Sequence, residues 1–530
     1  MELIHKTIGQ CLRVRAQKTG DMIGLEIDQW KCTYQQLDLY VDRTVLQMQR
    51  IGIRHGTHVG IWGINSGEWI VTFLALTRMG AIPVLFNSLY TQAEMKSVLN
   101  YSEVEYLYYG KGNKKLDYSE IIADIILDVP NIRFFVELQE AEFPFYDVML
   151  SKKEKELVNR LECETAVEDI ACMIFTSGTT SMPKAVMLTH YNLVNNARAM
   201  AKAMRWTEGD QMCFTVPLFH CFGITASLIP CILCGVTIHL IANFRTEKIW
   251  GAIENGCNIL NGVPSMFMVL ISKEKYAHIQ TDGVKSGMIA GSPISRMEYE
   301  AICKRFNKMH LLQAYGQTET SPCISIVDWD APMEVKANSV GRIMEHVQVR
   351  IVDPATEVVL GIGQDGEIQV KGYNVMKGYY NHPEETKKTI QGDGWLRTGD
   401  IGHLDLEGNL FITGRLKEII IRSGENIAPK EIEAEIRKVE WVEDVKVIGV
   451  PSPMTQEAVA ACLIIKKGYQ EKIEDIGEDI EEMLDFLEER LAHYKIPEHV
   501  VILKEFPMNA SGKIQLAKLK QMAIDQIRRQ

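Results

Sequence analysis

The chain has 530 residues, of which 46% are hydrophobic and 24% are charged. This composition excludes a disordered, collagen-like or coiled-coil chain, and the length predicts about three or four folding units. The net charge of −12, from 57 Lys and Arg against 69 Asp and Glu, argues against a general nucleic-acid or anionic-membrane binder. This net charge is still compatible with a local basic pocket that binds a phosphate ligand.

The N-terminus contains no apolar run of signal-peptide length, so we expect a cytoplasmic location. The twelve cysteines are scattered along the chain. Cys231 and Cys234 form a C-x-x-C without a second pair, so we interpret the cysteines as reduced structural residues and not as zinc ligands.

Residues 221–242 contain no Asp, Glu, Lys or Arg and approach the length of a membrane span. Pro230, Gly235 and several polar side chains interrupt the run. The segment therefore predicts a buried helix, a turn near 230–235 and a buried strand at 236–241, without stable membrane insertion.

Short apolar runs alternate with amphipathic stretches through the first half of the chain. The first unit is a strand at 58–64, a helix at 65–79 that stops at Gly80, and a strand at 81–86. The alternation continues at 92–100, 104–109, 170–175, 258–262, 285–290 and 310–314. It predicts parallel sheets covered by helices.

From Val347 the pattern changes to short strands, at 347–353 and 366–372, which predict a small β-rich subdomain. A block beyond Arg415 has strands at 418–421, 444–450 and 458–465 and helices at 429–439 and 473–491. The predicted fold class is α/β: a large N-terminal domain of Rossmann-like parallel sheets covered by helices, with a β-rich subdomain, and a small α+β C-terminal domain.

A loop rich in hydroxyl groups, 176–184, lies between two predicted strands. Short donors and a glycine let the backbone approach a triphosphate, and Lys184 adds a positive charge. A Walker P-loop is excluded because Pro183 and Ala185 flank the lysine and a strand follows it. Taken alone, the loop is also compatible with a polar surface turn.

This loop resembles the phosphate-binding signature of the adenylate-forming enzymes, which include acyl-CoA synthetases, luciferases and peptide-synthetase adenylation domains. Ser181 and Ala185 stand where glycine is usual. The resemblance implies that the loop binds ATP through Thr176, Ser177, Gly178, Thr179, Thr180 and Lys184, with Thr180 as a secondary Mg²⁺ contact.

Further segments match the same family in the same order. In 313–319, the resemblance places ATP or AMP contacts at Ala314, Tyr315, Gly316, Gln317 and Thr318, and Mg²⁺ at Glu319. Towards the C-terminus it assigns the ribose hydroxyls to Asp400, a nucleotide contact to Arg415, the hinge to Lys417, the CoA tunnel to Ser423 and Gly424, and catalysis to Lys513, with Thr318 and Glu319. It implies an N-terminal domain at 1–414, a hinge at 415–417 and a mobile lid at 418–530.

The segments around 217–220, 261–267 and 290–293 resemble the acyl pocket of fatty acyl-CoA ligases. The implied pocket residues are Phe219, His220, Val263, Gly291 and Ser292. No acidic residue occurs in 217–241 or 261–270, which favours an apolar acyl chain over a charged amino acid. The overall pattern looks most like medium-chain acyl-CoA synthetases.

The resemblance implies an AMP-forming ligase that uses ATP, Mg²⁺ and CoA to convert a carboxylic acid into its thioester. Its partners would be these small molecules, without nucleic acid, and an oligomer is compatible with the sequence. One alternative is an enzyme that loads the phosphopantetheine of a carrier protein. An alternative of another class is a nucleotide-binding regulator without catalysis.

Overall fold

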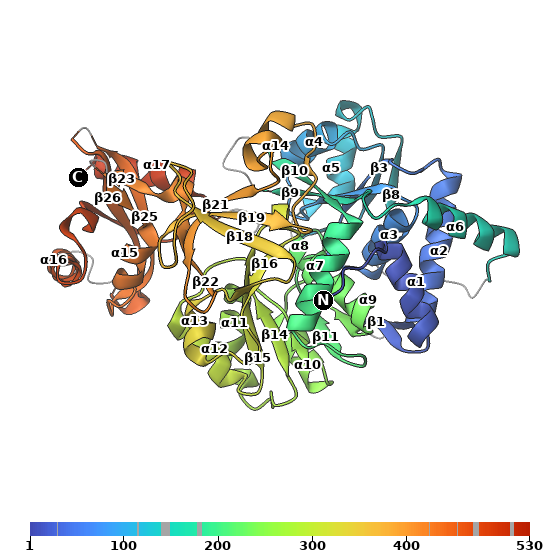
Figure 1. Ribbon diagram of the computed structural model, residues 1–530, viewed down its shortest axis with the longest axis horizontal. Helices are drawn as coiled ribbons and strands as arrows, with labels where there is room; N and C mark the ends of the chain where they lie inside the picture. Colours follow the sequence, from blue (N-terminus) through green and yellow to red (C-terminus); the bar gives the residue numbers. More distant parts are fainter. Residues whose placement is uncertain are drawn as a thin grey trace. The chain divides into compact units, whose positions relative to one another are not determined.

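A computed structural model describes residues 1–28, 30–113, 116–138, 149–176, 183–422, 425–452, 454–469, 476–508 and 514–529. The chain divides into two compact units. The first comprises Met1–Val349, Val370–Leu396 and Gly408–Leu410, and the second comprises Arg350–Gln369, Arg397–Glu407 and Phe411–Gln530. Mixed sheets with helices on them form both units (Figure 1).

One sheet of the first unit carries the strands on either side of the predicted phosphate loop. In spatial order it contains β20 (Gly378–Tyr379), β10 (Lys184–Thr189), β9 (Ile170–Thr176), β4 (Ile82–Phe86), β3 (His58–Trp62), β5 (Tyr106–Tyr109) and β8 (Phe134–Glu137). The strands from β9 to β8 are parallel, whereas β10 is antiparallel to both β9 and β20. The predicted parallel sheet is confirmed here.

Helix α3 (Gly67–Arg78) connects β3 to β4 as the sequence predicts. The Ser66 hydroxyl accepts the Trp69 N–H at 3.2 Å and caps the first turn. Gly80 has φ +71°, a left-handed conformation that ends the helix at little steric cost. The predicted helix and its stop are therefore confirmed, with the start two residues later than expected.

The second sheet of this unit carries the other predicted nucleotide segment at its edge. In spatial order it contains β17 (Arg342–Ile343), β16 (Cys323–Ile326), β15 (His310–Gly316), β14 (Ser286–Ile289), β13 (Ile259–Leu260), β11 (Gln211–Phe214), β12 (Thr237–Leu240), β1 (Ile23–Ile27) and β2 (Trp30–Thr33). The strands from β15 to β1 are parallel, and those at the two edges are antiparallel. A two-stranded antiparallel sheet of β6 (Gly112–Asn113) and β7 (Leu116–Asp117) also lies in this unit.

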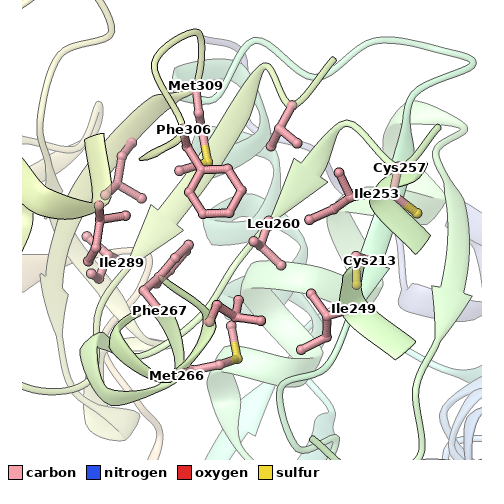
Figure 2. Close-up of a cluster of buried hydrophobic side chains, with 14 of the residues drawn as sticks. Cys213, Ile249, Ile253, Cys257, Leu260, Met266, Phe267, Ile289, Phe306 and Met309 are labelled. Carbon is pink, nitrogen blue, oxygen red and sulfur yellow. The ribbon is translucent and has the colours of Figure 1, made fainter. Parts of the chain in front are cut away.

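The helices of the first unit cover these sheets. They are α1 (Ile8–Thr19), α2 (Tyr34–Arg50), α4 (Gln92–Tyr101), α5 (Tyr118–Ile125), α6 (Lys152–Glu164), α7 (His190–Ala203), α8 (Cys221–Gly223), α9 (Ile229–Cys234), α10 (Thr246–Glu254), α11 (Pro264–Ile271), α12 (Arg296–Arg305), α13 (Met333–Asn338) and α14 (Pro383–Thr389). Short 3₁₀ turns lie at η1 (Ile126–Asp128), η3 (Glu274–Tyr276) and η4 (Thr318–Thr320). An apolar cluster fills the space between α10–α12 and the second sheet, with Phe267 and Phe306 fully buried (Figure 2).

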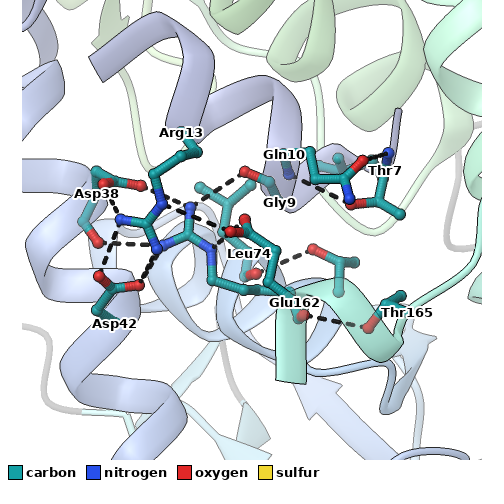
Figure 3. A network of polar contacts seen from close by, with 12 residues as sticks. Thr7, Gly9, Gln10, Arg13, Asp38, Asp42, Leu74, Glu162 and Thr165 are labelled. Atoms are coloured by element: carbon teal, nitrogen blue, oxygen red, sulfur yellow. Dashed lines mark hydrogen bonds and ion pairs between the residues drawn. The ribbon is translucent and has the colours of Figure 1, made fainter. Parts of the chain in front are cut away.

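A buried charged cluster fixes the N-terminal helices to one another (Figure 3). Arg78 on α3 lies 2.6 Å from Asp38 and 2.6 Å from Asp42, both on α2. Its Nε is 3.3 Å from Glu162 on α6, and Arg13 on α1 pairs with the same three carboxylates. We call these five residues the scaffold cluster.

The structure corrects the turn predicted at 230–235. The backbone stays helical from α8 through the π-helical segment η2 (Ile224–Leu228) to the end of α9, and it turns only at Gly235, with φ +77°. Pro230 is tolerated because it directly follows the widened π turn, and because the Ala226 carbonyl, four residues earlier, accepts the Asn261 amide at 2.9 Å instead of a backbone N–H. The strand predicted at 236–241 is confirmed as β12.

The second unit contains two further sheets. One has the order β18 (Val347–Val352), β19 (Gly366–Gly372), β21 (Leu396–Leu404) and β22 (Leu410–Arg415), and most of these residues belong to the second unit. The other contains β24 (Glu425–Ile427), β23 (Ile420–Arg422), β26 (Gln456–Ile465), β25 (Val442–Ser452) and β27 (His499–Leu503). Its helices are α15 (Pro429–Ile436), α16 (Ile476–Glu488) and α17 (Leu516–Ile527), with turns at η5 (Leu416–Glu418) and η7 (His493–Lys495).

The small α+β region is confirmed, with shifted boundaries. The strand predicted at 418–421 begins only at Ile420, because the Ile419 N–H donates to the Arg415 carbonyl at 3.1 Å and closes a turn. Apolar side chains fill both faces of its central strand β26. Among the residues that the structure describes, no helix is long and apolar enough to cross a bilayer.

Candidate functional site

The described ends of the predicted phosphate loop meet. Thr176 ends β9, Lys184 begins β10, and the two residues are register partners. The Thr176 hydroxyl donates to the Lys184 carbonyl at 3.4 Å. The loop residues Ser177, Gly178, Thr179, Thr180 and Ser181 lie outside the described residues.

Lys184 has two partners from the segment at 376–389. Its ammonium lies 2.7 Å from the Glu385 carboxylate and 4.9 Å from the centre of the Tyr379 ring. The hydrogen bond from Lys184, with help from Lys388, lowers the pKa of Glu385 to about 2. The ammonium is therefore held by an ionised carboxylate on one side and an aromatic face on the other.

The second predicted segment, Ala314 to Glu319, comprises the last residues of β15 and the tight reversal after it. Gly316 approaches the Pro322 carbonyl so closely that a Cβ would lie 1.7 Å from its oxygen, so no side chain fits there. Tyr315, Gln317 and Thr318 are half-buried beside it. The reversal places this segment at the carboxyl end of a parallel strand, where α/β sheets commonly bind ligands.

Glu319, in turn η4, is fixed by the same segment that holds Lys184. The Tyr379 hydroxyl donates to Glu319 Oε1 at 2.9 Å, and the Met376 N–H donates to the Glu319 carbonyl at 2.9 Å. Burial and the neighbouring Glu319 carboxylate raise the pKa of Tyr379, so its hydroxyl keeps its proton. Tyr379 thereby brings the predicted phosphate lysine and the predicted metal carboxylate to one place.

This arrangement fits a magnesium ion that arrives with a triphosphate. Mg²⁺ is usually held by one or two carboxylates together with phosphate oxygens, and Glu319 is a half-buried carboxylate oriented by a hydroxyl donor. Within the described part of the chain, no group of three or more His, Cys, Asp or Glu side chains could hold a metal. A single carboxylate such as Glu319 suits an ion whose other ligands are phosphate oxygens.

The predicted acyl entrance, 217–220, is anchored by a residue that the sequence analysis did not single out. Asn65, just after β3, donates to the carbonyls of Val216 and Ile241 at 3.0 and 3.3 Å and accepts the Leu218 N–H at 2.9 Å. One buried amide thus joins the ends of strands from both sheets. The Phe219 and His220 rings follow, 4.5 Å apart between centroids.

Two of the predicted pocket-wall residues lie together. Val263 is the N-cap of α11, and Gly291 follows β14 with φ +90°. A Cβ on Gly291 would lie 3.3 Å from Val263 Cγ1. Ser292 is exposed beside Gly291.

The remaining described site residues belong to the second unit. Asp400 on β21 is buried, and its Oδ1 lies 2.9 Å from Nε of the exposed Arg415, so these two predicted nucleotide residues are paired. Lys417 lies in η5, and its side chain is outside the described part of the chain. Ser423, Gly424 and Lys513 also lie outside the described residues.

Tyr379 and Glu385 are two further residues of this site that no sequence motif had indicated. The acidic residues after Pro383 are typical of a helix start, and that reading left no reason to pair one of them with a lysine far away in sequence. The signal for Tyr379 is the pair of tyrosines in Gly378-Tyr-Tyr380, because a tyrosine hydroxyl usually finds a hydrogen-bond partner when it is buried.

Comparisons with known proteins agree on one family. A family model described as "AMP-binding enzyme" matches residues 12–380, and a second, "AMP-binding enzyme C-terminal domain", matches residues 431–513. The mitochondrial medium-chain acyl-CoA ligase ACSF2 of Bos taurus is 32% identical over 550 residues, covering 98% of this chain and 88% of that protein.

Two solved structures have the same fold along nearly the whole chain. ATP-bound MatB from Rhodopseudomonas palustris superposes with a TM-score of 0.84 at 24% identity, covering 98% of this chain and 99% of that one. A Mycobacterium tuberculosis fatty acyl CoA synthetase gives a TM-score of 0.74 at 25% identity, covering 97% and 98%. The predicted fold class is therefore confirmed.

Proposed function

The chain belongs to the AMP-binding enzyme family and is an AMP-forming acid–thiol ligase, and we propose that it joins a medium-chain fatty acid to CoA through an acyl-adenylate. The observation that carries the proposal is the meeting of Lys184 and Glu319 on Tyr379. A cation for the triphosphate and a carboxylate for its metal ion are both needed to bind Mg-ATP.

In the first step, an oxygen of the fatty acid carboxylate attacks the α-phosphorus of ATP, and pyrophosphate leaves. Lys184 binds the triphosphate, Tyr315 lies along the adenine, Thr318 contacts phosphate and Asp400 accepts the ribose hydroxyls. Mg²⁺ held by Glu319 supplies charge neutralisation on the phosphate oxygens. Lys513 is proposed to stabilise the negative charge that grows on the bridging oxygen.

In the second step, the CoA thiol gives its proton to water and its sulfur attacks the acyl carbon of the mixed anhydride, and AMP leaves with the electrons of the broken C–O bond. Ser423 and Gly424 are proposed to border the path of the thiol arm. The acceptance of a neutral acyl chain is supported by the apolar residues Phe219 and Val263 and by the lack of acidic residues in 217–241 and 261–270. The medium-chain ligase named above supports the choice of chain length.

Domain alternation about Lys417 is part of the proposal, with domains at 1–414 and 418–530. Anchors on either side of this residue support a hinge there. Arg415 pairs with Asp400 on β21, whereas Glu418 lies 3.1 Å from Lys446 on β25, which also pairs with Glu433 on α15. Only Leu416 and Lys417 lie between these two anchored residues.

Replacing Lys513 by Ala tests the first step. The change should abolish carboxylate-dependent exchange of labelled pyrophosphate into ATP, while thioester formation from a supplied acyl-adenylate survives. Lys518→Ala is the matched control, because Lys518 is an exposed lysine at the start of the following helix α17. Exchange at the wild-type rate in Lys513→Ala would refute the role given to that lysine.

A panel of carboxylates of increasing length tests the substrate, with AMP release and thioester formation as readouts. We expect the highest kcat/KM for medium-chain acids and thioester formation on free CoA. Transfer only to the phosphopantetheine of a purified carrier protein would contradict the CoA assignment. Binding of the nucleotide without any pyrophosphate exchange would indicate a nucleotide-binding regulator.

A further inference from the structure

We propose that Tyr379 and Glu385 are positioning residues: Tyr379 orients the Glu319 carboxylate, and Glu385 holds the Lys184 ammonium in place for the triphosphate. The inference rests on the proposed function, because it assumes that Lys184 and Glu319 bind Mg-ATP. Both positioning residues come from one short segment, β20 and α14, that pairs with the strand following the phosphate loop.

The segment is fixed to its surroundings before any ligand is considered. Tyr379 faces Val186 of β10 in the sheet, and the Tyr380 N–H donates to the Ala185 carbonyl at 2.9 Å. The Tyr379 N–H donates to the hydroxyl of Thr386 at 2.9 Å, which ties β20 to α14. The two positioning side chains therefore have a common rigid support, as precise ligand sites require.

Tyr379 serves both charged groups with different parts of its side chain. Its hydroxyl donates to Glu319 Oε1, and its ring face lies under the Lys184 ammonium. The side chain is 7% exposed, so water competes weakly for either interaction. A phenylalanine would retain the ring contact and remove only the hydroxyl that orients the carboxylate.

The charge balance shows why Glu385 is an aligning group and not a competitor of the triphosphate. Its Oε2 binds Lys184 at 2.7 Å, and its Oε1 binds Lys388 at 2.8 Å. Two lysines surround one carboxylate, so the three groups together carry a charge of +1. This charge offsets the Glu319 carboxylate on Tyr379, and a lysine that has three donors can keep Glu385 while it binds a phosphate oxygen.

Holding Lys184 in advance removes part of the entropy that a free lysine side chain loses when it binds a phosphate. This effect acts on ATP binding in the ground state and in the transition state alike, so we expect it in KM and not in kcat. The orientation of Glu319 by Tyr379 instead affects how strongly ATP binding depends on Mg²⁺. The two positioning residues thus predict two different signatures.

The first experiment compares Tyr379→Phe with Tyr380→Phe. The neighbouring Tyr380 hydroxyl also donates to a carboxylate, Glu103 at 2.6 Å, so the control removes an equivalent bond outside the site. Calorimetry with a non-hydrolysable ATP analogue should show about tenfold weaker binding in Mg²⁺ for Tyr379→Phe and equal binding without Mg²⁺. Wild-type binding in Mg²⁺ would overturn the role of Tyr379.

The second experiment compares Glu385→Gln with Glu384→Gln. Glu384 precedes it in the same helix turn and pairs with Lys387 at 2.9 Å, so the control removes a similar ion pair. Glu385→Gln should weaken binding of the ATP analogue about fivefold, both with and without Mg²⁺. It should also raise the KM for ATP and leave kcat near the wild-type value. Tighter binding would show competition with phosphate and overturn the proposal.

Glu319→Gln separates failure of this inference from failure of the proposed function. If Glu319→Gln loses the Mg²⁺ dependence but Tyr379→Phe and Glu385→Gln match wild type, the inference is wrong and the function stands. If Glu319→Gln itself leaves Mg²⁺-dependent binding unchanged, the proposed metal role of that residue fails. Because Glu385 is partly exposed, its variant remains informative if Tyr379→Phe does not fold.

Discussion

Two charged clusters of the first unit, the scaffold cluster and the cluster around Tyr379, contain similar ion pairs but differ in how deeply they are buried. In the scaffold cluster, Arg78 is fully buried and each of its carboxylate partners is at most 10% exposed. In the cluster around Tyr379, Lys184 is 21% and Glu385 is 35% exposed. Burial, and not the presence of ion pairs, separates the two.

The difference in burial determines what each cluster can do. A buried ion pair is costly to break, because the remaining charge cannot be hydrated. A partly exposed lysine can exchange partners at little cost, because water compensates for the lost contact. A fold can therefore be fixed by one kind of cluster, while the other kind receives a charged ligand.

The largest effect is expected in the scaffold cluster. Arg78→Met leaves Asp38, Asp42 and Glu162 facing Arg13 alone, so we expect a loss of about 3–5 kcal/mol in the free energy of unfolding. Urea unfolding followed by circular dichroism measures it. Lys285→Met is a useful control, because Lys285 is 34% exposed and the Asp210 carboxylate that remains keeps its hydrogen bonds from Thr207 and Asn258, so the change should cost less. An equal loss in both variants would contradict the comparison.

A smaller effect is expected from pH, and it also concerns the N-terminal scaffold. Burial lowers the pKa of His190 to about 4, and its Nδ1 accepts the Ile8 N–H at the start of α1 at 3.2 Å. As the pH falls, His190 takes up a proton in the unfolded chain before it does so in the folded protein. Its contribution to the free energy of unfolding is therefore fully present above pH 6.5, and about 3 kcal/mol is lost as the pH drops to 4.

The measurement is the free energy of unfolding of wild type and His190→Gln across this pH range. Groups distant from His190 titrate equally in both proteins, and its neighbour Asp169 has a lowered pKa, so the wild type should lose stability more steeply between pH 6.5 and 4. Parallel curves would show that His190 is not the group responsible.

The smallest effect in free energy is expected at the site. Lys184→Met should lower kcat/KM for ATP about 30-fold, which corresponds to about 2 kcal/mol for one charged hydrogen bond. The free energy of unfolding should change by less than about 1 kcal/mol, because the lost ion pair is partly exposed. A large loss of stability would place Lys184 with the scaffold and end the distinction.

The elements with strong local signals were predictable from the sequence. The β3–α3–β4 unit follows from buried apolar runs and a glycine stop, each of which acts within a few residues. The turn misplaced near Pro230 shows the limit of this reasoning. A π turn ahead of the proline changes what the helix tolerates, and no local residue pattern announces it.

The site was predictable only in part, for a related reason. The resemblance placed Lys184 and Glu319 in one family pattern, their roles stay predictions, and it did not indicate how the two side chains are held. Tyr379 and Glu385 act across about 60 and 200 residues of sequence, and only the pairing of β20 with β10 brings them there. Contacts of this kind depend on the register of two distant strands.

The buried amide of Asn65 has a consequence for how substrate choice could evolve in this protein. It ties the backbone before Phe219 to the end of β3, so the proposed acyl entrance inherits its position from the other sheet. Substitutions within the entrance can change the shape of its side chains but leave its backbone where Asn65 fixes it. A wider or deeper entrance would require the two sheets to shift together.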